Sequence, residues 1–236
     1  MIFVVARHDV YVRLHNRILA AIETCLPVVD VRPIDEGVCH LLPSEAREGV
    51  ALAQRIKTAL AENFSPVLTC STGMAPTEFL AKIGAEMDKP DGFTLISSID
   101  LPTRLEKLKL NDLPGISSGM EARLKAAGVP NVQTLWKLAP KQARAIRGSV
   151  EGERFWNELH GLHPQRSETA KSMFGHSRLL PLDWRTPEKV RDCGEQLTAS
   201  ASRRLRRADL RATKLTLGFR GSGYRSSTGS KKDDLR

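Results

Sequence analysis

The succession of strand-like and helix-like segments changes character near residue 98 of this chain of 236 residues. Before that point, short apolar runs alternate with segments whose apolar residues recur every three or four positions. Such alternation is typical of a sheet covered by helices. Residues 99–165 instead carry short helical patterns and no good strand run. A single uniform layer is thereby excluded, and the pattern predicts an α+β fold built from several small parts.

Four parts are expected along the chain. Residues 1–98 combine strands and helices, and residues 99–165 form a small all-helical module. Residues 166–220 hold a long helix between two strand-like segments. From residue 221 onward the chain is rich in Gly and Ser, so a disordered tail is expected over 221–236.

The individual elements follow from apolar spacing and from breakers such as Pro27 and Gly128. In the first part we expect a helix over 9–25, a hairpin of strands 28–34 and 38–42, a helix from Pro43, strands over 67–70 and 93–96, a turn over 71–76, and a helix capped by Thr77. Later in the chain we expect short helices within 120–159, strands over 171–180 and 214–219, and a helix over 187–208.

Charge is divided unevenly between the two halves of the chain. Residues 1–98 carry 9 Lys and Arg against 12 Asp and Glu, whereas residues 99–236 carry 27 against 15. A basic half suggests a polyanion as partner, although a soluble protein of high pI explains the charge equally well.

Cysteine spacing and hydropathy limit the cellular compartments in which this protein is expected. None of the four cysteines has the spacing of a zinc site, which favours a reducing environment. We see no signal peptide and no run of the roughly 20 apolar residues that a membrane span needs. A cytoplasmic protein without membrane contact is the prediction.

Two adjacent carboxylates, Asp35 and Glu36, interrupt an otherwise apolar stretch over 28–37. Magnesium prefers oxygen ligands, so a carboxylate pair at a strand end is a candidate Mg²⁺ site. The plainer alternative is that both cap a strand and face water. Lys82 and Lys89 flank the end of a nearby expected helix, where a lysine can bind a triphosphate as a point charge or remain an ordinary surface residue.

The segment 113–129 has the pattern of a helix-hairpin-helix. A glycine such as Gly115 lets backbone N–H groups approach a phosphate, and the start of the following helix adds partial positive charge. Ser117 stands where a second glycine is usual. An ordinary pair of antiparallel helices remains the alternative.

Basic residues cluster around Leu205 on the helix expected over 187–208 and on the strand after it. They suggest a continuous DNA-binding surface, or else a solvated helix face. The members are Arg203, Arg204, Arg206, Arg207, Arg211, Lys214 and Arg220.

The order of these pieces resembles a Y-family (translesion, UmuC/DinB-like) DNA polymerase. Ile34-Asp35-Glu36 resembles the family's S-I-D-E-A motif, residues 70–83 resemble S-x-G-I-A-x-N-K-x-L-A-K-I, and residues 88–92 resemble K-P-x-G. Residues 113–116 resemble the thumb hairpin, and residues 171–219 the start of the little finger. The departures are Pro33 for the serine of the first motif, Thr77-Glu78 for the N-K pair of the second, and Ser117 for the second hairpin glycine.

The resemblance implies roles for individual residues. Asp35 would bridge two Mg²⁺ ions, Glu36 would bind the ion that activates the primer 3′-hydroxyl, and Lys89 would contact a deoxynucleoside triphosphate. Primer–template DNA would be held by the hairpin and by the little finger. The residues assigned to DNA are Gly115, Ile116, Ser117, Lys171, Arg203, Arg204, Arg207, Arg211 and Lys214.

By the same comparison the chain is expected to hold a partial palm at 1–98, a thumb at 99–165 and a partial little finger at 166–220. The family's first metal-binding Asp and its fingers have no counterpart in this sequence, so we expect feeble incorporation or none. The alternatives are a non-enzymatic DNA-binding accessory protein and an unrelated helix-hairpin-helix protein. The resemblance also implies damage tolerance within the SOS response, association with the nucleoid, and a sliding clamp as a candidate partner.

Overall fold

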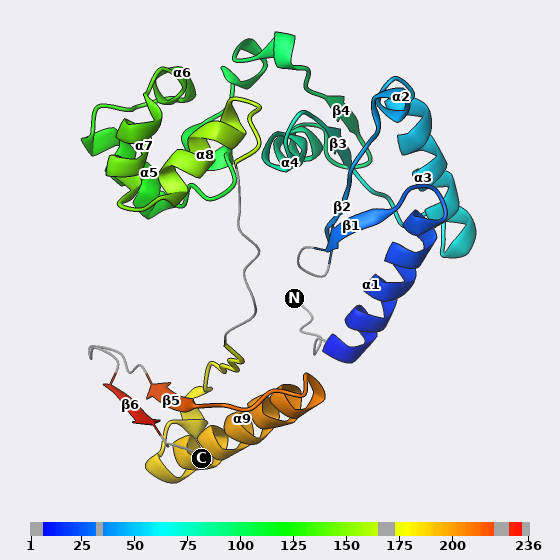
Figure 1. Ribbon diagram of the computed structural model, residues 1–236. Coiled ribbons are helices and arrows are strands. Elements are labelled where there is room, and N and C mark those ends of the chain that lie inside the picture. Colours follow the sequence, from blue (N-terminus) through cyan, green and yellow to red (C-terminus); the bar gives the residue numbers. More distant parts are fainter. Residues whose placement is uncertain (1–6, 32–34, 165–172, 220–226, 233–236) are drawn as a thin grey trace. The chain divides into compact units, whose positions relative to one another are not determined.

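The computed structural model describes residues 7–31, 35–164, 173–219 and 227–232. The chain divides into two compact units, Met1–Gln165 and Arg166–Arg236, and each is described by itself (Figure 1). The expected boundary at residue 165 therefore coincides with the division between the units.

The first unit begins with helices and short strands. Their order is α1 (His8–Glu23), β1 (Val28–Val31), β2 (Gly37–Cys39), α2 (Pro43–Ala46), α3 (Gly49–Asn63), β3 (Thr72–Met74), α4 (Glu78–Met87) and β4 (Phe93–Leu95). Three short 3-10 turns follow: Ser98–Asp100, Thr103–Leu105 and Leu110–Asp112. The unit ends with α5 (Ser118–Ala126), α6 (Val132–Trp136), α7 (Pro140–Arg147) and α8 (Glu151–Leu159), which group together in Figure 1.

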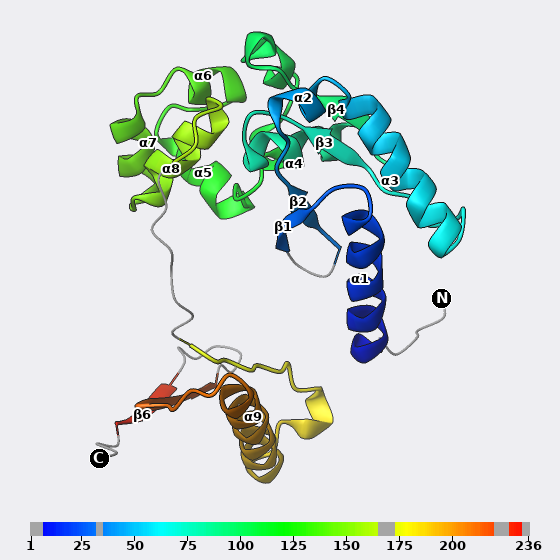
Figure 2. The same ribbon diagram turned by 45° about the vertical axis from the view of Figure 1, so that its right-hand side comes forward.

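The expected hairpin is confirmed. β1 and β2 are labelled beside each other in Figure 2. They are antiparallel, with Val28 opposite Cys39 and Val31 opposite Gly37. Pro33 and Ile34 lie outside the described residues. Asp35 and Glu36 fall in the connection between the two strands, where no regular alternation forces neighbouring side chains to opposite faces.

The prediction of a strand over residues 67–70 is wrong. Val67 is 85% exposed, and the strand β3 forms at Thr72–Met74 instead, parallel to β4. Gly73 explains this position, because a Cβ there would overlap the carbonyl oxygen of Ala81 on α4. The close approach of α4 to the β3 backbone thus selects the segment that pairs, and the segment expected to be a turn becomes the strand.

One apolar core runs across residue 98 without interruption. It joins buried residues of α4, and Ile96 directly after β4, with residues of the later turns and helices. Its members are Leu80, Ile83, Ile96, Leu105, Leu110, Leu113, Ile116, Leu124, Val129, Val132, Leu135, Phe155 and Leu159. Residues 1–98 and 99–165 were expected as separate parts, but they share this core within one compact unit.

A second apolar cluster lies where α1 and α3 are in contact. Its buried members are Ala21, Leu26, Leu52, Ala53, Ala59 and Leu60. Leu52, Ala53, Ala59 and Leu60 recur at helical spacing on α3, which gives that helix its buried face.

The second unit contains an irregular segment, one long helix and a hairpin. Leu182–Trp184 form a 3-10 turn, α9 spans Pro187–Arg207, β5 spans Lys214–Phe219 and β6 spans Ser227–Lys232. β5 and β6 are antiparallel, from Lys214 opposite Lys232 to Phe219 opposite Ser227. In the described part of this unit, Cys193 is the one apolar side chain classed as buried.

Two expectations for the second unit are wrong. The strand expected over 171–180 is not formed by its described residues, 173–180, which have no ladder partner. The tail expected to be disordered from residue 221 contains β6, because its Gly- and Ser-rich stretch pairs with the full length of β5. Backbone pairing does not require apolar side chains, so composition alone misplaces such a strand.

Among the described residues, no helix combines the length and the apolar character required to cross a membrane.

Candidate nucleic-acid interface and acidic site

One member of the acidic pair, Glu36, contacts α4 at the surface of the first unit. Asp35 is exposed and Glu36 is half-buried. The Nζ of Lys82, on α4, lies 2.5 Å from the Oε1 of Glu36. The side chains are 41% exposed for Lys82 and 36% exposed for Glu36, so this ion pair is open to solvent. Its net contribution to stability is therefore modest.

Lys89 also lies near the acidic pair. Its Nζ donates to Glu86 Oε1 at 2.6 Å. This hydrogen bond raises the pKa of Lys89. Burial opposes the increase, and the negative charges of Glu86, Asp35 and Glu36 each raise the pKa by a smaller amount. Asp35, Glu36 and Lys89, which were assigned to one site, are therefore close enough to interact electrostatically, although the contact partner of Lys89 is Glu86.

Asp35 and Glu36 offer the type of ligand that a hard divalent cation needs, because Mg²⁺ prefers carboxylate oxygens. Among the residues that the structure describes, no group of three or more His, Cys, Asp or Glu has the geometry to hold a metal ion. Lys82 already neutralises Glu36, so a cation bound there would have to displace the lysine ammonium from that carboxylate.

The hairpin turn has the backbone shape that its glycine predicts. Gly115 has a φ of +80°, a conformation that costs residues with a Cβ about 1–2 kcal/mol. α5 begins just after the turn, at Ser118, and the Glu121 N–H donates to the Ser117 carbonyl at 2.8 Å. Gly115 and Ser117 are exposed, so this turn and the first N–H groups of α5 can meet a phosphate.

Ile116 has a different place from the one expected. Its side chain is 4% exposed and belongs to the core, and its backbone N–H donates to the Leu113 carbonyl at 3.1 Å. The expected phosphate contact of Ile116 is therefore at variance with this geometry. Ile116 anchors the turn instead.

Two functional residues were not foreseen in these roles. Arg147, at the end of α7, donates from Nη2 to the Gly115 carbonyl at 3.3 Å, across 32 positions of sequence. Thr77 caps α4 as expected, but its hydroxyl also donates to the Glu158 carbonyl of α8 at 2.9 Å. No spacing rule connects residues so far apart, so only the fold reveals these links.

The described basic residues of α9 and of the segment after it are exposed, and one of them donates a hydrogen bond to a backbone carbonyl. Arg204 donates to the Gly175 carbonyl at 2.9 Å and so fastens the segment 173–181 to α9. Lys171 and Arg220 lie outside the described residues. The exposed basic residues are Arg203, Arg204, Arg206, Arg207, Arg211 and Lys214.

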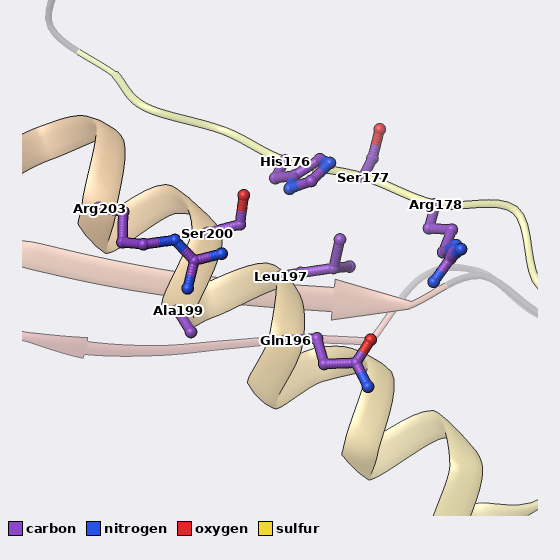
Figure 3. Close-up of a pocket in the computed structure, with 8 residues that line it drawn as sticks. All are labelled: His176, Ser177, Arg178, Gln196, Leu197, Ala199, Ser200 and Arg203. Carbon is purple, nitrogen blue, oxygen red and sulfur yellow. The ribbon is translucent and has the colours of Figure 1, made fainter. Parts of the chain in front are cut away.

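A shallow groove of about 570 Å³ runs between this segment and α9 (Figure 3). His176, Ser177 and Arg178 line it from the segment, and α9 contributes Arg203 among others. The remaining lining residues are Gln196, Leu197, Ala199 and Ser200. Its polar and cationic lining is compatible with an anionic ligand.

Comparisons with known proteins place this geometry in context. A family model described as the impB/mucB/samB family matches residues 1–86. The chain is 31% identical over 214 residues to DNA polymerase IV of Moorella thermoacetica, a match that covers 87% of this chain and 52% of that protein. It is 28% identical over 209 residues to DNA polymerase IV 1 of Bacillus subtilis, covering 86% of this chain and 50% of that protein.

The fold is similar to that of solved polymerases. A Y-family DNA polymerase chimera, Dbh-Dpo4(243-245)-Dbh, matches with a TM-score of 0.77 at 22% identity, over 99% of this chain and 67% of the chimera. The expected α+β polymerase-like fold is thereby confirmed. The chain spans about half the length of the curated relatives it matches.

Proposed function

This chain is a relative of the Y-family, DinB-like DNA polymerases, and from that kinship we propose that it binds primer–template DNA and serves template-directed nucleotidyl transfer in translesion synthesis. The observation that carries the proposal is the contact between Glu36 of the acidic pair and Lys82, 46 positions later in the sequence, while the negative charges of Asp35 and Glu36 also act on Lys89. Carboxylates beside ammonium groups suit a reaction in which triphosphate charge must be neutralised.

Each part of the chain has a task in this proposal. Asp35 and Glu36 would hold a divalent cation, which when bound stabilises the attacking and leaving oxygens of an in-line displacement. Lys89 would neutralise the triphosphate as a point charge. The Gly115 turn and the start of α5 would receive a backbone phosphate, and the arginines of α9 would add contacts that do not depend on sequence.

A second candidate function is DNA binding without catalysis, as an accessory protein. The specific observation in its favour is the 2.5 Å contact between Lys82 and Glu36, which gives the carboxylate a structural partner. In this alternative the acidic pair stabilises the β1–β2 connection, and the hairpin and the arginines of α9 carry the whole function.

Primer extension separates the two candidates. The full chain would be incubated with a labelled primer–template, Mg²⁺ and all four deoxynucleoside triphosphates, beside Asp35→Ala and the charge-matched control Glu62→Ala, an exposed site on α3. Incorporation that is lost in Asp35→Ala and kept in Glu62→Ala supports the polymerase proposal. No incorporation by any of the three, with DNA binding intact, supports the accessory role.

DNA binding itself is tested by fluorescence anisotropy at several salt concentrations. We expect affinity for primer–template to be independent of sequence and to fall steeply between about 50 and 200 mM salt, because each neutralised phosphate adds about 0.9 to the slope of log K against log salt. Binding that is absent at low salt would contradict both candidates. A sliding clamp, action in the SOS response and association with the nucleoid are further predictions of the same kinship.

A further inference from the structure

We infer that Arg147 is a positioning residue for the hairpin turn: it holds the Gly115–Ile116 peptide group so that the Gly115 carbonyl stays away from a phosphate bound by the first N–H groups of α5, and does not itself contact DNA. This inference rests on the proposed DNA binding. It concerns a residue outside the hairpin segment, contributed by the last turn of α7.

The peptide group between Gly115 and Ile116 is held at both ends. Its N–H donates to the Leu113 carbonyl at 3.1 Å, and its carbonyl accepts from the Arg147 guanidinium at 3.3 Å. A peptide group is planar, so these two contacts fix the rotation of the whole plane. Without the contact to Arg147, only the hydrogen bond to the Leu113 carbonyl would oppose rotation of this plane.

Rotation of this plane would matter because Gly115 permits it. A glycine adopts positive and negative φ almost equally well, so its peptide groups turn over more readily than those of other residues. A turned plane would direct the Gly115 carbonyl outward, where its partial negative charge would repel a phosphate. Arg147 favours the orientation in which this carbonyl is directed at its guanidinium.

The surroundings of Arg147 fit an internal role. Its guanidinium lies 4.7 Å from the centre of the Phe155 ring, and its own carbonyl accepts from Arg123 of α5 at 3.4 Å. Its side chain also lines a small apolar cavity with Leu124 and Leu135. Burial lowers the pKa of Arg147, against an opposing effect of Glu151, whereas a residue that reaches for DNA would stand in solvent.

Two variants distinguish positioning from direct contact. Arg147→Lys keeps the charge but not the planar fork that reaches Gly115 while stacking on Phe155. Arg147→Met keeps much of the apolar stem and removes the charge. Lys141→Met is the control, because it removes one charge from an exposed site on the same helix. Thermal unfolding of each full-length variant comes first, and Arg147→Lys preserves the test if Arg147→Met fails to fold.

Anisotropy with a labelled duplex gives the first readout. We expect both Arg147 variants to bind about three- to tenfold more weakly than the wild type, with the slope of log K against log salt unchanged and Lys141→Met within about twofold. If Arg147→Lys bound as the wild type and Arg147→Met lost about 0.9 of slope, Arg147 would be a phosphate contact and the inference would be overturned. Wild-type affinity in both variants would overturn it as well.

Hydrogen exchange of the free protein gives a readout that does not depend on DNA. We expect the Ile116 amide to exchange about tenfold faster in both Arg147 variants, with the amides of α8 unchanged and Lys141→Met equal to the wild type. If no protein in the series bound DNA, the proposed function would fail, and the exchange data would still decide whether Arg147 restrains the turn. Unchanged exchange at Ile116 would overturn the restraint.

Discussion

A single buried hydroxyl connects α4 to α8. Thr77 is 2% exposed, its oxygen accepts from the Leu80 N–H at 3.3 Å, and it donates to the Glu158 carbonyl at 2.9 Å. We expect Thr77→Val to lower the free energy of unfolding by about 2 kcal/mol, because it removes an N-cap and one of the hydrogen bonds to the Glu158 carbonyl, which also accepts from the Gly161 N–H. Urea unfolding measures the change, and Thr77→Ser, which keeps the hydroxyl, should lose clearly less. Equal losses in the two variants would show that the methyl group contributes as much as the hydroxyl and would contradict this expectation.

His160 is stacked between two indole rings. Its ring lies 3.9 Å from that of Trp136 and 3.8 Å from that of Trp156, and its nitrogens lie 3.1 and 2.8 Å from the backbone carbonyls of the same two residues. Burial lowers the pKa of His160, and the two carbonyls oppose this in part. The unfolded chain, with a pKa of about 6.5, therefore binds the proton more tightly than the folded protein.

The sign of the pH dependence follows from that difference. The contribution of His160 to stability is complete above about pH 6.5 and falls as the pH drops toward the folded-state pKa. We expect the melting temperature of His160→Phe, which keeps an aromatic ring between the tryptophans and cannot titrate, to fall less than that of the wild type between about pH 7.5 and pH 5.5. A steeper fall in the variant would mean that the carbonyls, not burial, dominate the pKa of His160.

At the scale of elements, the turn before α5 depends on the left-handed backbone conformation of one glycine. Gly115 has a φ of +80°, whereas Gly119 lies in the first turn of α5, where an added methyl group would meet open space. We expect Gly115→Ala to cost about 1 kcal/mol of stability, and Gly119→Ala to be neutral or slightly stabilising. Chemical denaturation of the pair measures both. A loss in Gly119→Ala as large as that in Gly115→Ala would show that glycine content, not backbone conformation, sets the effect.

Elements with strong local signals were predictable from the sequence. Thr77 at the start of α4, Pro187 at the start of α9 and the alternation of residues 214–219 each carry their cause in the adjacent residues. The strand near Val67 was misplaced because a three-residue strand is selected by its partner β4 and by the approach of α4 to Gly73. Those causes lie about 10 to 20 residues away, beyond the reach of a local pattern.

In the candidate site, too, some features were predictable from the sequence and others were not. The assignment of Lys89, Asp35 and Glu36 to one site followed from motif resemblance, and the two carboxylates do act electrostatically on Lys89. The withdrawal of Ile116 into the core was not foreseen, because its spacing is equally suitable for a backbone contact and for an apolar anchor. The assigned roles of these residues in binding metal, triphosphate or DNA remain predictions.

At the scale of the whole molecule, the two units differ in the amount of core that they bury. The first unit holds both apolar clusters, and the described part of the second has Cys193 as its one buried apolar side chain. We expect a fragment of residues 1–165 to unfold cooperatively with a midpoint close to the main transition of the full chain. A fragment of residues 166–236 should show a broad, weak transition or none. Circular dichroism on heating tests both, and a sharp transition in the second fragment would contradict the expectation.

A row of aromatic contacts gives the first unit a further property. The Gly115 carbonyl is bound by Arg147, Arg147 stacks on Phe155, and the Phe155 ring meets Phe79 of α4 edge-on at 5.0 Å. Rigid side chains thus fill the distance from the hairpin turn to the helix that carries Lys82. If the turn binds a phosphate as proposed, this row of contacts would keep the distance between that phosphate and α4 constant.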